Sequence, residues 1–184
     1  MAPVLLYLAV QEPLFIILQM LQPKYLSWEV KKIYDMLILI FSLALATHIY
    51  TDCKEQLLYD KVSTALMVTG VIYAHYFGDM WQAVYGALVS FAIMLAIYWL
   101  SKGGMGLGDV KLAFVLGIWL GLEQSLLCLL LAFVTGGLVG IGLLVTGLKS
   151  RKDAIPFGPY LCIAGLVSLL YGKELLNWYW QLWL

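Results

Sequence analysis

The stretch SKGGMGLGDVKL, Ser101 to Leu112, lies between two long apolar segments and places one aspartate, Asp109, behind four glycines. Each glycine inside a helix costs about 1 kcal/mol relative to alanine, so this stretch should interrupt regular structure just before Asp109. Irregular backbone at membrane depth is tolerated only where protein or a water-filled cavity covers it. The stretch is therefore expected to line a cavity that an extended peptide could enter.

The composition around this stretch is far more apolar than that of a soluble domain. Of the 184 residues, 63% are hydrophobic and 12% are charged, and the mean hydropathy is +0.91. These values predict an integral membrane protein in contact with a lipid bilayer. The formal net charge of zero gives no electrostatic support for nucleic acid as a partner. Three scattered cysteines and two separate histidines predict no metal site and no disulfide framework.

Apolar runs near the length that a helix needs to cross the hydrocarbon core predict an all-α, polytopic transmembrane helical bundle. The seven expected spans are 4–22, 34–51, 62–78, 82–100, 110–121, 125–147 and 156–172. Within the sixth span, Gly136 and Gly140 have the spacing that lets helices approach closely in lipid. The expected organisation is an N-terminal helix and connection at 1–33, a six-helix core at 34–172, and an aromatic interfacial tail at 173–184.

Basic residues favour one orientation of this bundle. If the loop 52–61 is cytoplasmic, seven basic residues fall on that side and four on the other, as the positive-inside rule requires. The seven are Lys54, Lys61, Lys102, Lys111, Lys149, Arg151 and Lys152, and the four are Lys24, Lys31, Lys32 and Lys173. Asp52 and Asp109 then lie on the same cytoplasmic face, where they can meet.

Asp52, at the end of the second expected span, and Asp109, at the start of the fifth, are the candidate site residues. An ionisable side chain at the edge of a span usually marks a site, a pathway or a pairing partner, although each aspartate could also lie in a wetted loop. Two carboxylates in a partly desolvated site share a proton and titrate together. Aspartic proteases use such a pair to activate a water and polarise the scissile carbonyl.

Other chemistries fit the sequence less well. The glycines follow neither the dinucleotide-binding nor the Walker A pattern, so a phosphate-binding loop is not expected. A small transporter or channel could use the aspartates for proton or cation passage. Transporters often carry paired broken helices, whereas only one glycine-broken segment is visible here. A catalytically silent scaffold of pilus or secretion assembly is a further alternative.

Three motifs resemble those of the type IV prepilin peptidases, membrane aspartic proteases of the GxGD type. GMGLGDVKL, residues 104–112, resembles their G-x-G-x-G-D-x-K-L signature. DCKEQLLYD, residues 52–60, is similar to the family's aspartate followed by six residues and then Pro-Asp or Pro-Asn. IPFGPYL, residues 155–161, is similar to the Ile-Pro-Phe-Gly-Pro motif that opens the family's last helix.

This resemblance implies removal of the short basic leader of type IV prepilins or pseudopilins, after a glycine, at the cytoplasmic face of a bacterial inner membrane. Asp52 and Asp109 carry over as the catalytic pair. The remaining matched positions are the site-shaping loop of Gly104, Gly106 and Gly108, and the candidates for substrate contact or support, Lys111, Asp60, Pro156 and Gly158. Larger members carry Cys-x-x-Cys pairs associated with N-methylation, so neither methyltransferase activity nor a cofactor such as S-adenosylmethionine is expected here.

Three residues near Asp52 need separate interpretation. Tyr59 stands where the family usually has proline, which predicts a less rigidly set turn after the helix that carries Asp52. His48 lies four residues before Asp52 and could tune its proton affinity, but a polar helix-interface role is the favoured interpretation. Glu55, like Asp60, could attract a basic leader.

Overall fold

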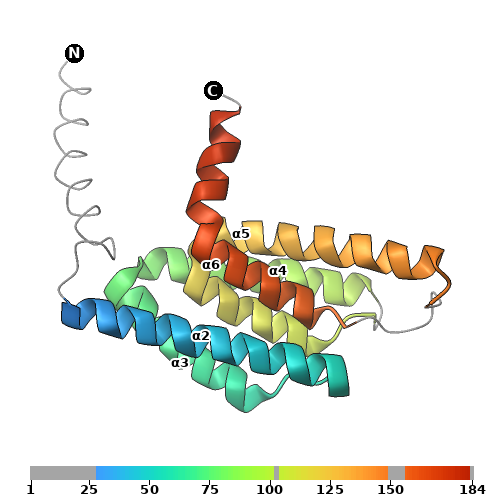
Figure 1. The fold of residues 1–184 in the computed structure, drawn as a ribbon, viewed down its shortest axis with the longest axis horizontal. Helices are drawn as coiled ribbons and strands as arrows, with labels where there is room; N and C mark the ends of the chain where they lie inside the picture. The colour runs from blue at the N-terminus through green and yellow to red at the C-terminus, as the bar shows by residue number, and fades with distance from the viewer. Residues whose placement is uncertain (1–27, 102–103, 149–155, 183–184) are drawn as a thin grey trace. The chain divides into compact units, whose positions relative to one another are not determined.

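The computed structural model describes residues 28–101, 104–148 and 156–182, which are helical apart from short connections. Five helices follow one another: α2 (Trp28–Glu55), α3 (Asp60–Phe77), α4 (Met80–Leu100), α5 (Leu107–Val145) and α6 (Gly158–Gln181) (Figure 1). No strand occurs within these described ranges. The all-α prediction is confirmed. The chain divides between Leu39 and Ile40 into two compact units, and the packing below belongs to the second.

Four of the described helices, α2, α4, α5 and α6, are long and apolar enough to cross a membrane, as expected of a multi-pass membrane protein. The prediction of seven spans is wrong for the described part of the chain. The expected span 4–22 lies outside it. The expected span 62–78 forms α3, which is not among these four helices. Its first turn holds the polar residues Asp60, Lys61 and Ser63, which lower its mean hydropathy.

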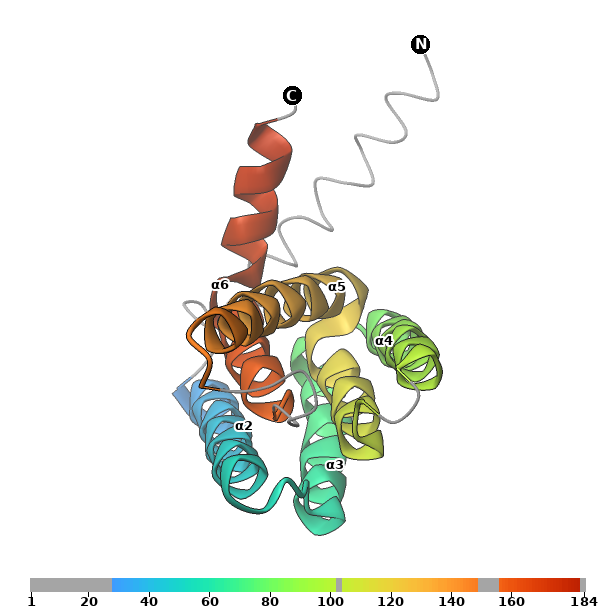
Figure 2. The same cartoon turned by 90° about the vertical axis from the view of Figure 1, so that its right-hand side faces the viewer.

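The expected spans 110–121 and 125–147 are joined in one element, α5, which is kinked at Gly121. Gly121 has φ 71° and ψ −178°, a backbone conformation that is essentially restricted to glycine. The segments before and after the kink run in different directions (Figure 2). The break expected between the two spans therefore exists, as a kink at a glycine and not as a loop.

Helices α4 and α5 meet where neither has a side chain. A Cβ built on Gly86 of α4 would lie 2.5 Å from the carbonyl carbon of Gly121 and 2.6 Å from the carbonyl oxygen of Gly117. Real Cβ atoms do not approach backbone so closely, so the two helices cross at this distance only because glycine stands on both sides. This contact fixes the position of α5 against α4.

Trp119 joins α5 to α3. Its indole N–H donates a hydrogen bond of 2.8 Å to the Leu66 carbonyl, and its ring stacks on Tyr73 with centroids 4.9 Å apart. A Cβ on Gly70 would lie 2.6 Å from the indole, so this glycine provides the space for the ring. Phe41 of α2 also packs on the indole, with ring centroids 4.6 Å apart.

The last helix is longer than its predicted span. Helix α6 begins at Gly158 and continues to Gln181, so most of the expected aromatic tail is helical, with Trp178 and Trp180 exposed. The boundaries 1–33, 34–172 and 173–184 stay a prediction.

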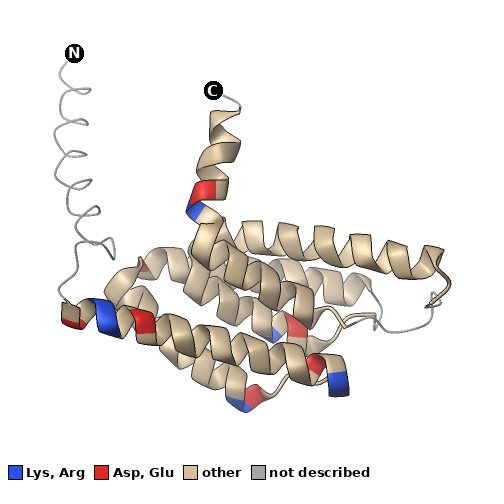
Figure 3. Ribbon diagram, in the orientation of Figure 1, with Lys and Arg blue, Asp and Glu red and all other residues tan. Residues whose placement is uncertain are grey.

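Charged residues lie mainly towards the helix ends, and α4 carries none (Figure 3).

Candidate active site

The two candidate aspartates occupy helix ends that lie on the same side of the helical core. Asp52 is in the last turn of α2 and Asp109 is in the first turn of α5 (Figure 1). Each side chain is only 7% exposed. The charge of the Asp52 carboxylate acts on Asp109, so the two groups lie within electrostatic range of each other. The structure therefore brings together two carboxylates that are 57 positions apart in the chain.

The glycine stretch positions Asp109. Gly106 has extended backbone, with φ −78° and ψ 143°, and caps α5, whose first helical residue is Leu107. The backbone N–H of Asp109 donates to the Gly106 carbonyl at 3.2 Å. The break in regular structure thus lies before Leu107, two residues earlier than predicted, and Asp109 is inside the first turn, where the helix dipole favours an acidic residue.

Gly108 brings this loop against the turn that follows Asp52. A Cβ on Gly108 would lie 3.0 Å from Cδ1 of Leu58, which belongs to the turn between α2 and α3. A Cβ on Gly106 would lie 3.6 Å from Oδ2 of Asp109, in ordinary contact with the carboxylate. Gly104 lies further back, where the atoms nearest to its Cβ belong to Ser101. Of the three loop glycines, Gly106 lies against a carboxylate and Gly108 lies against the turn that follows Asp52.

The start of α6 lies against Asp52. A Cβ on Gly158 would lie 2.6 Å from Oδ2 of Asp52, and the backbone of Gly158 interacts with this carboxylate. Pro156, half-buried, precedes Phe157, the N-cap residue of α6. Within the described residues, Oδ2 of Asp52 is buried without a hydrogen-bond partner. The third sequence motif thus supplies the backbone that faces the first aspartate.

His48 lies one turn before Asp52 and is completely buried. Its Nε2 is 3.2 Å from Oγ of Ser63 on α3, and Thr51 donates to its backbone carbonyl at 3.2 Å. These contacts are those of a polar residue in a helix interface, the interpretation that the sequence favoured. His48 also shows how the last turns of α2 are fixed against α3.

The turn after Asp52 contains the departure from the family pattern. Tyr59 has φ −72°, which is within the range that a proline ring imposes, so the tyrosine adopts a backbone conformation that proline could also adopt. Its hydroxyl donates to Oε2 of Glu55 at 2.7 Å, and this hydrogen bond raises the pKa of the Tyr59 hydroxyl. Gln56, with φ 52°, ends α2 in the left-handed region. The turn is therefore defined without proline.

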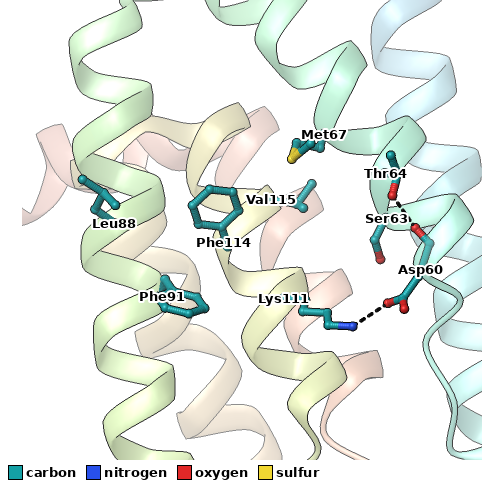
Figure 4. A pocket seen from close by; sticks show the side chains of 9 residues that line it. All are labelled: Asp60, Ser63, Thr64, Met67, Leu88, Phe91, Lys111, Phe114 and Val115. Carbon is teal, nitrogen blue, oxygen red and sulfur yellow. Dashed lines mark hydrogen bonds and ion pairs between the residues drawn. The ribbon is translucent and has the colours of Figure 1, made fainter.

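Lys111 and Asp60 form an exposed ion pair between α5 and α3, with 2.8 Å between Nζ and Oδ1 (Figure 4). They border a cavity of about 440 Å³ between α3, α4 and α5. The other lining residues are Ser63, Thr64, Met67, Leu88, Phe91, Phe114 and Val115. Neither Asp52 nor Asp109 lines this cavity, so Lys111 and Asp60 lie beside the carboxylate site and not in it.

Comparisons with known proteins identify relatives of the chain. Residues 37–141 match the family model described as the type IV leader peptidase family. Proteins named prepilin leader peptidase/N-methyltransferase match from Aeromonas hydrophila (34% identical over 148 residues, 77% of this chain and 51% of the relative) and Legionella pneumophila (33% over 168 residues, 87% and 58%). A protein of the same name from Pseudomonas putida is 42% identical over 133 residues, 67% of this chain and 46% of the relative.

The chain spans about half the length of these curated relatives. No solved structure matches it. The matched region contains both aspartates and the complete glycine stretch. The motif resemblance seen in the sequence is therefore confirmed, and the chain belongs to the type IV leader peptidase family.

Proposed function

We propose that the chain is a membrane aspartic endopeptidase that removes the leader of type IV prepilins or pseudopilins after a glycine. The observation that carries this proposal is the pair of buried carboxylates, Asp52 and Asp109, within electrostatic range at two neighbouring helix ends. Membership of the type IV leader peptidase family supports the substrate class. The name that these relatives share, prepilin leader peptidase/N-methyltransferase, supports the same substrate class.

The chemistry needs only the two carboxylates and a water. Two acids this close share one proton between them. The ionised member takes a proton from the water, whose oxygen attacks the scissile carbonyl carbon, while the protonated member donates its proton to the carbonyl oxygen. When the tetrahedral intermediate collapses, the C–N bond breaks and the amine leaves with the proton returned by the first carboxylate, while the second carboxylate takes back a hydroxyl proton as the C=O bond re-forms. The pair of Asp52 and Asp109 again holds one proton, as it did at the start.

The proposed site faces the cytoplasm of a bacterium, at its inner membrane. Lys54 and Lys111 lie at the same helix ends as Asp52 and Asp109, and Lys61 lies in the first turn of α3; these basic residues support this orientation. Two acidic residues expected to attract a basic leader are already engaged, Asp60 with Lys111 and Glu55 with Tyr59. The ion pair weakens the steering effect of Asp60, whereas a hydrogen bond from a neutral hydroxyl leaves the electrostatic attraction of Glu55 in place.

The test is co-expression with a type IV prepilin, comparing wild type with Asp52→Asn and Asp109→Asn. Asparagine keeps the shape of the side chain and removes its acid–base function, so each variant should lose at least about 100-fold in cleavage rate. Matched controls are Asp35→Asn on α2 and Glu123→Gln on α5, both exposed carboxylates on the same helices. Gel mobility and product mass report cleavage after glycine.

Two results would contradict the proposal in different ways. Wild-type cleavage by either asparagine variant would rule out the two-aspartate mechanism. Failure of the wild type to cleave any prepilin, while inserted in the membrane, would rule out the peptidase. Ion flux into proteoliposomes would then distinguish the transporter interpretation from the silent scaffold.

A further inference from the structure

The first residue of α6 is Gly158, and the carboxylate of Asp52 occupies the space that a side chain at this position would fill. From the position that a Cβ of Gly158 would occupy, the three nearest atoms all belong to Asp52: Oδ2 at 2.6 Å, Cγ at 3.0 Å and Cβ at 3.4 Å. The closest contacts at this position are therefore made by the proposed catalytic side chain.

The carboxylate that fills this space is buried and incompletely paired. Asp52 is only 7% exposed, and its Oδ2 has no hydrogen-bond partner within the described ranges. A buried polar atom without a partner destabilises a fold, so a fold keeps one mainly where it serves a purpose. Gly158 is the first residue of α6, and the partial positive charge at a helix N-terminus suits a carboxylate.

We propose that Gly158 is a positioning residue for the reaction: its bare backbone lets Oδ2 of Asp52 pack against the start of α6 and so fixes the direction of the carboxylate. This inference rests on the proposed function. Any side chain at position 158 would occupy the space of Oδ2 and turn the carboxylate away from its working direction. A displacement of about 1 Å in a catalytic group can cost about 100-fold in rate.

The geometry predicts that a substitution here spares the fold. The atom closest to a new Cβ at position 158 is the end of the Asp52 side chain, which can rotate out of the way. A backbone atom at this distance could not do so. Alanine is also a better helix former than glycine. Gly158→Ala should therefore fold and insert normally while its Asp52 carboxylate is displaced.

Gly165→Ala is the matched control. Gly165 lies on the same helix and is also buried, and a Cβ there would lie 3.0 Å from Cδ2 of Leu116, again the end of a flexible side chain. The two variants thus make the same chemical change and meet a similar steric demand. They differ in the neighbour that must move, a carboxylate in one and an isobutyl group in the other.

Cleavage kinetics on purified full-length protein in detergent give the first readout. Gly158→Ala should lower kcat at least tenfold, leave KM within about twofold, and shift the pH–rate profile, because only the acid–base group is moved. Gly165→Ala should keep the wild-type kcat and pH–rate profile. Equal loss of kcat in both variants, or wild-type kcat in Gly158→Ala, overturns the inference.

The second readout does not depend on activity. The carbonyl stretch of protonated carboxyl groups is followed by infrared difference spectroscopy during a pH titration, with Asp52→Asn identifying the band of Asp52. Gly158→Ala should shift this band or its midpoint, and Gly165→Ala should not. An unchanged band overturns the inference. A shifted band in a protein whose wild type cleaves no prepilin supports the contact between Gly158 and Asp52 and refutes the proposed function instead.

Discussion

Two glycine contacts in this protein look alike and serve different ends. At Gly86 and Gly117, α4 and α5 approach so closely that backbone lies against backbone. At Gly158, the start of α6 approaches Asp52 as closely, but there backbone lies against a carboxylate. In both places a Cβ would meet an atom at 2.6 Å or less.

The two contacts differ in whether the neighbouring atoms can move away. Backbone inside a helix cannot retreat without breaking the helix, so the α4–α5 contact determines the position of α5 and, with it, of Asp109. A carboxylate can rotate, so the contact at Gly158 determines the direction of one side chain. The first glycine pair acts on the fold, and the second contact acts on the proposed chemistry. Substitutions at these sites should separate stability from activity.

The largest effect is expected at the α4–α5 contact. Gly117→Ala would place a Cβ 2.5 Å from the Gly86 carbonyl carbon and 2.6 Å from Cα of Ala87. Since only backbone could move, stability should fall by about 3 kcal/mol, the upper end of the usual cost of overpacking. Thermal unfolding in detergent, followed by circular dichroism, measures the loss.

Gly137→Ala is the control for this prediction, because it lies on the same helix and its Cβ would meet no described atom within 4 Å. It should unfold at the wild-type temperature or slightly above, since alanine favours the helix. If Gly117→Ala unfolded as late as this control, the backbone contact could not be what holds α5 against α4.

An intermediate effect is expected at Gly108, where a new Cβ would meet Cδ1 of Leu58 at 3.0 Å. Because Leu58 can shift, Gly108→Ala should cost about 1 kcal/mol, less than Gly117→Ala. In the Leu58→Ala background the same substitution should cost less, since Cδ1 and Cγ are gone and only the Cβ of residue 58, at 3.2 Å, remains in the way. A double-mutant cycle of unfolding free energies measures this coupling. Equal costs in both backgrounds would show that Leu58 is not the residue that alanine displaces.

Part of this arrangement could be predicted from the sequence. Apolar runs predicted most of the described helices, and the expected span 82–100 differs from α4 by two residues at its start. Residues 28–33 of α2 and 173–181 of α6 are helical where no span was expected. The number of spans could not be predicted, because a hydropathy window does not reveal whether two apolar runs are joined through a kink such as that at Gly121. The packing of Trp119 against α3 also has no local signature.

The sequence predicted close helix packing at one pair of glycines, and the structure shows it at another pair. Gly136 and Gly140 were expected to mark close packing, but the atoms nearest to a Cβ on Gly136 belong to side-chain rings, Tyr160 at 3.3 Å and Phe157 at 3.6 Å, and not to backbone. Gly117 and Gly121 have the same four-residue spacing, and they make the backbone contact with α4. Spacing alone does not say which helix face has a partner.

The site was predictable to the extent that motifs encode it. Asp52 and Asp109 could be paired because both were expected at helix ends on one side of the membrane. The contact of Gly158 with Asp52 could not be found this way, because 106 positions separate the two residues and a glycine carries no chemical signal of its partner. The motif indicated only that something near Gly158 mattered.

The smallest effect is expected at the ion pair of Lys111 with Asp60, a third kind of contact that water can replace. Its side chains are 56% and 72% exposed, so the coupling in a cycle of Lys111→Met and Asp60→Asn should stay below about 1 kcal/mol and shrink at high salt. Asp60→Asn should cost more than Lys111→Met, because Asp60 also lies in the first turn of α3, where a negative charge is favourable. A coupling comparable to the cost of Gly117→Ala would mean that this ion pair stabilises the packing of α3 on α5 as much as the glycines stabilise the packing of α4 on α5. Contacts between movable side chains would then matter as much for stability as contacts between backbones, contrary to the comparison above.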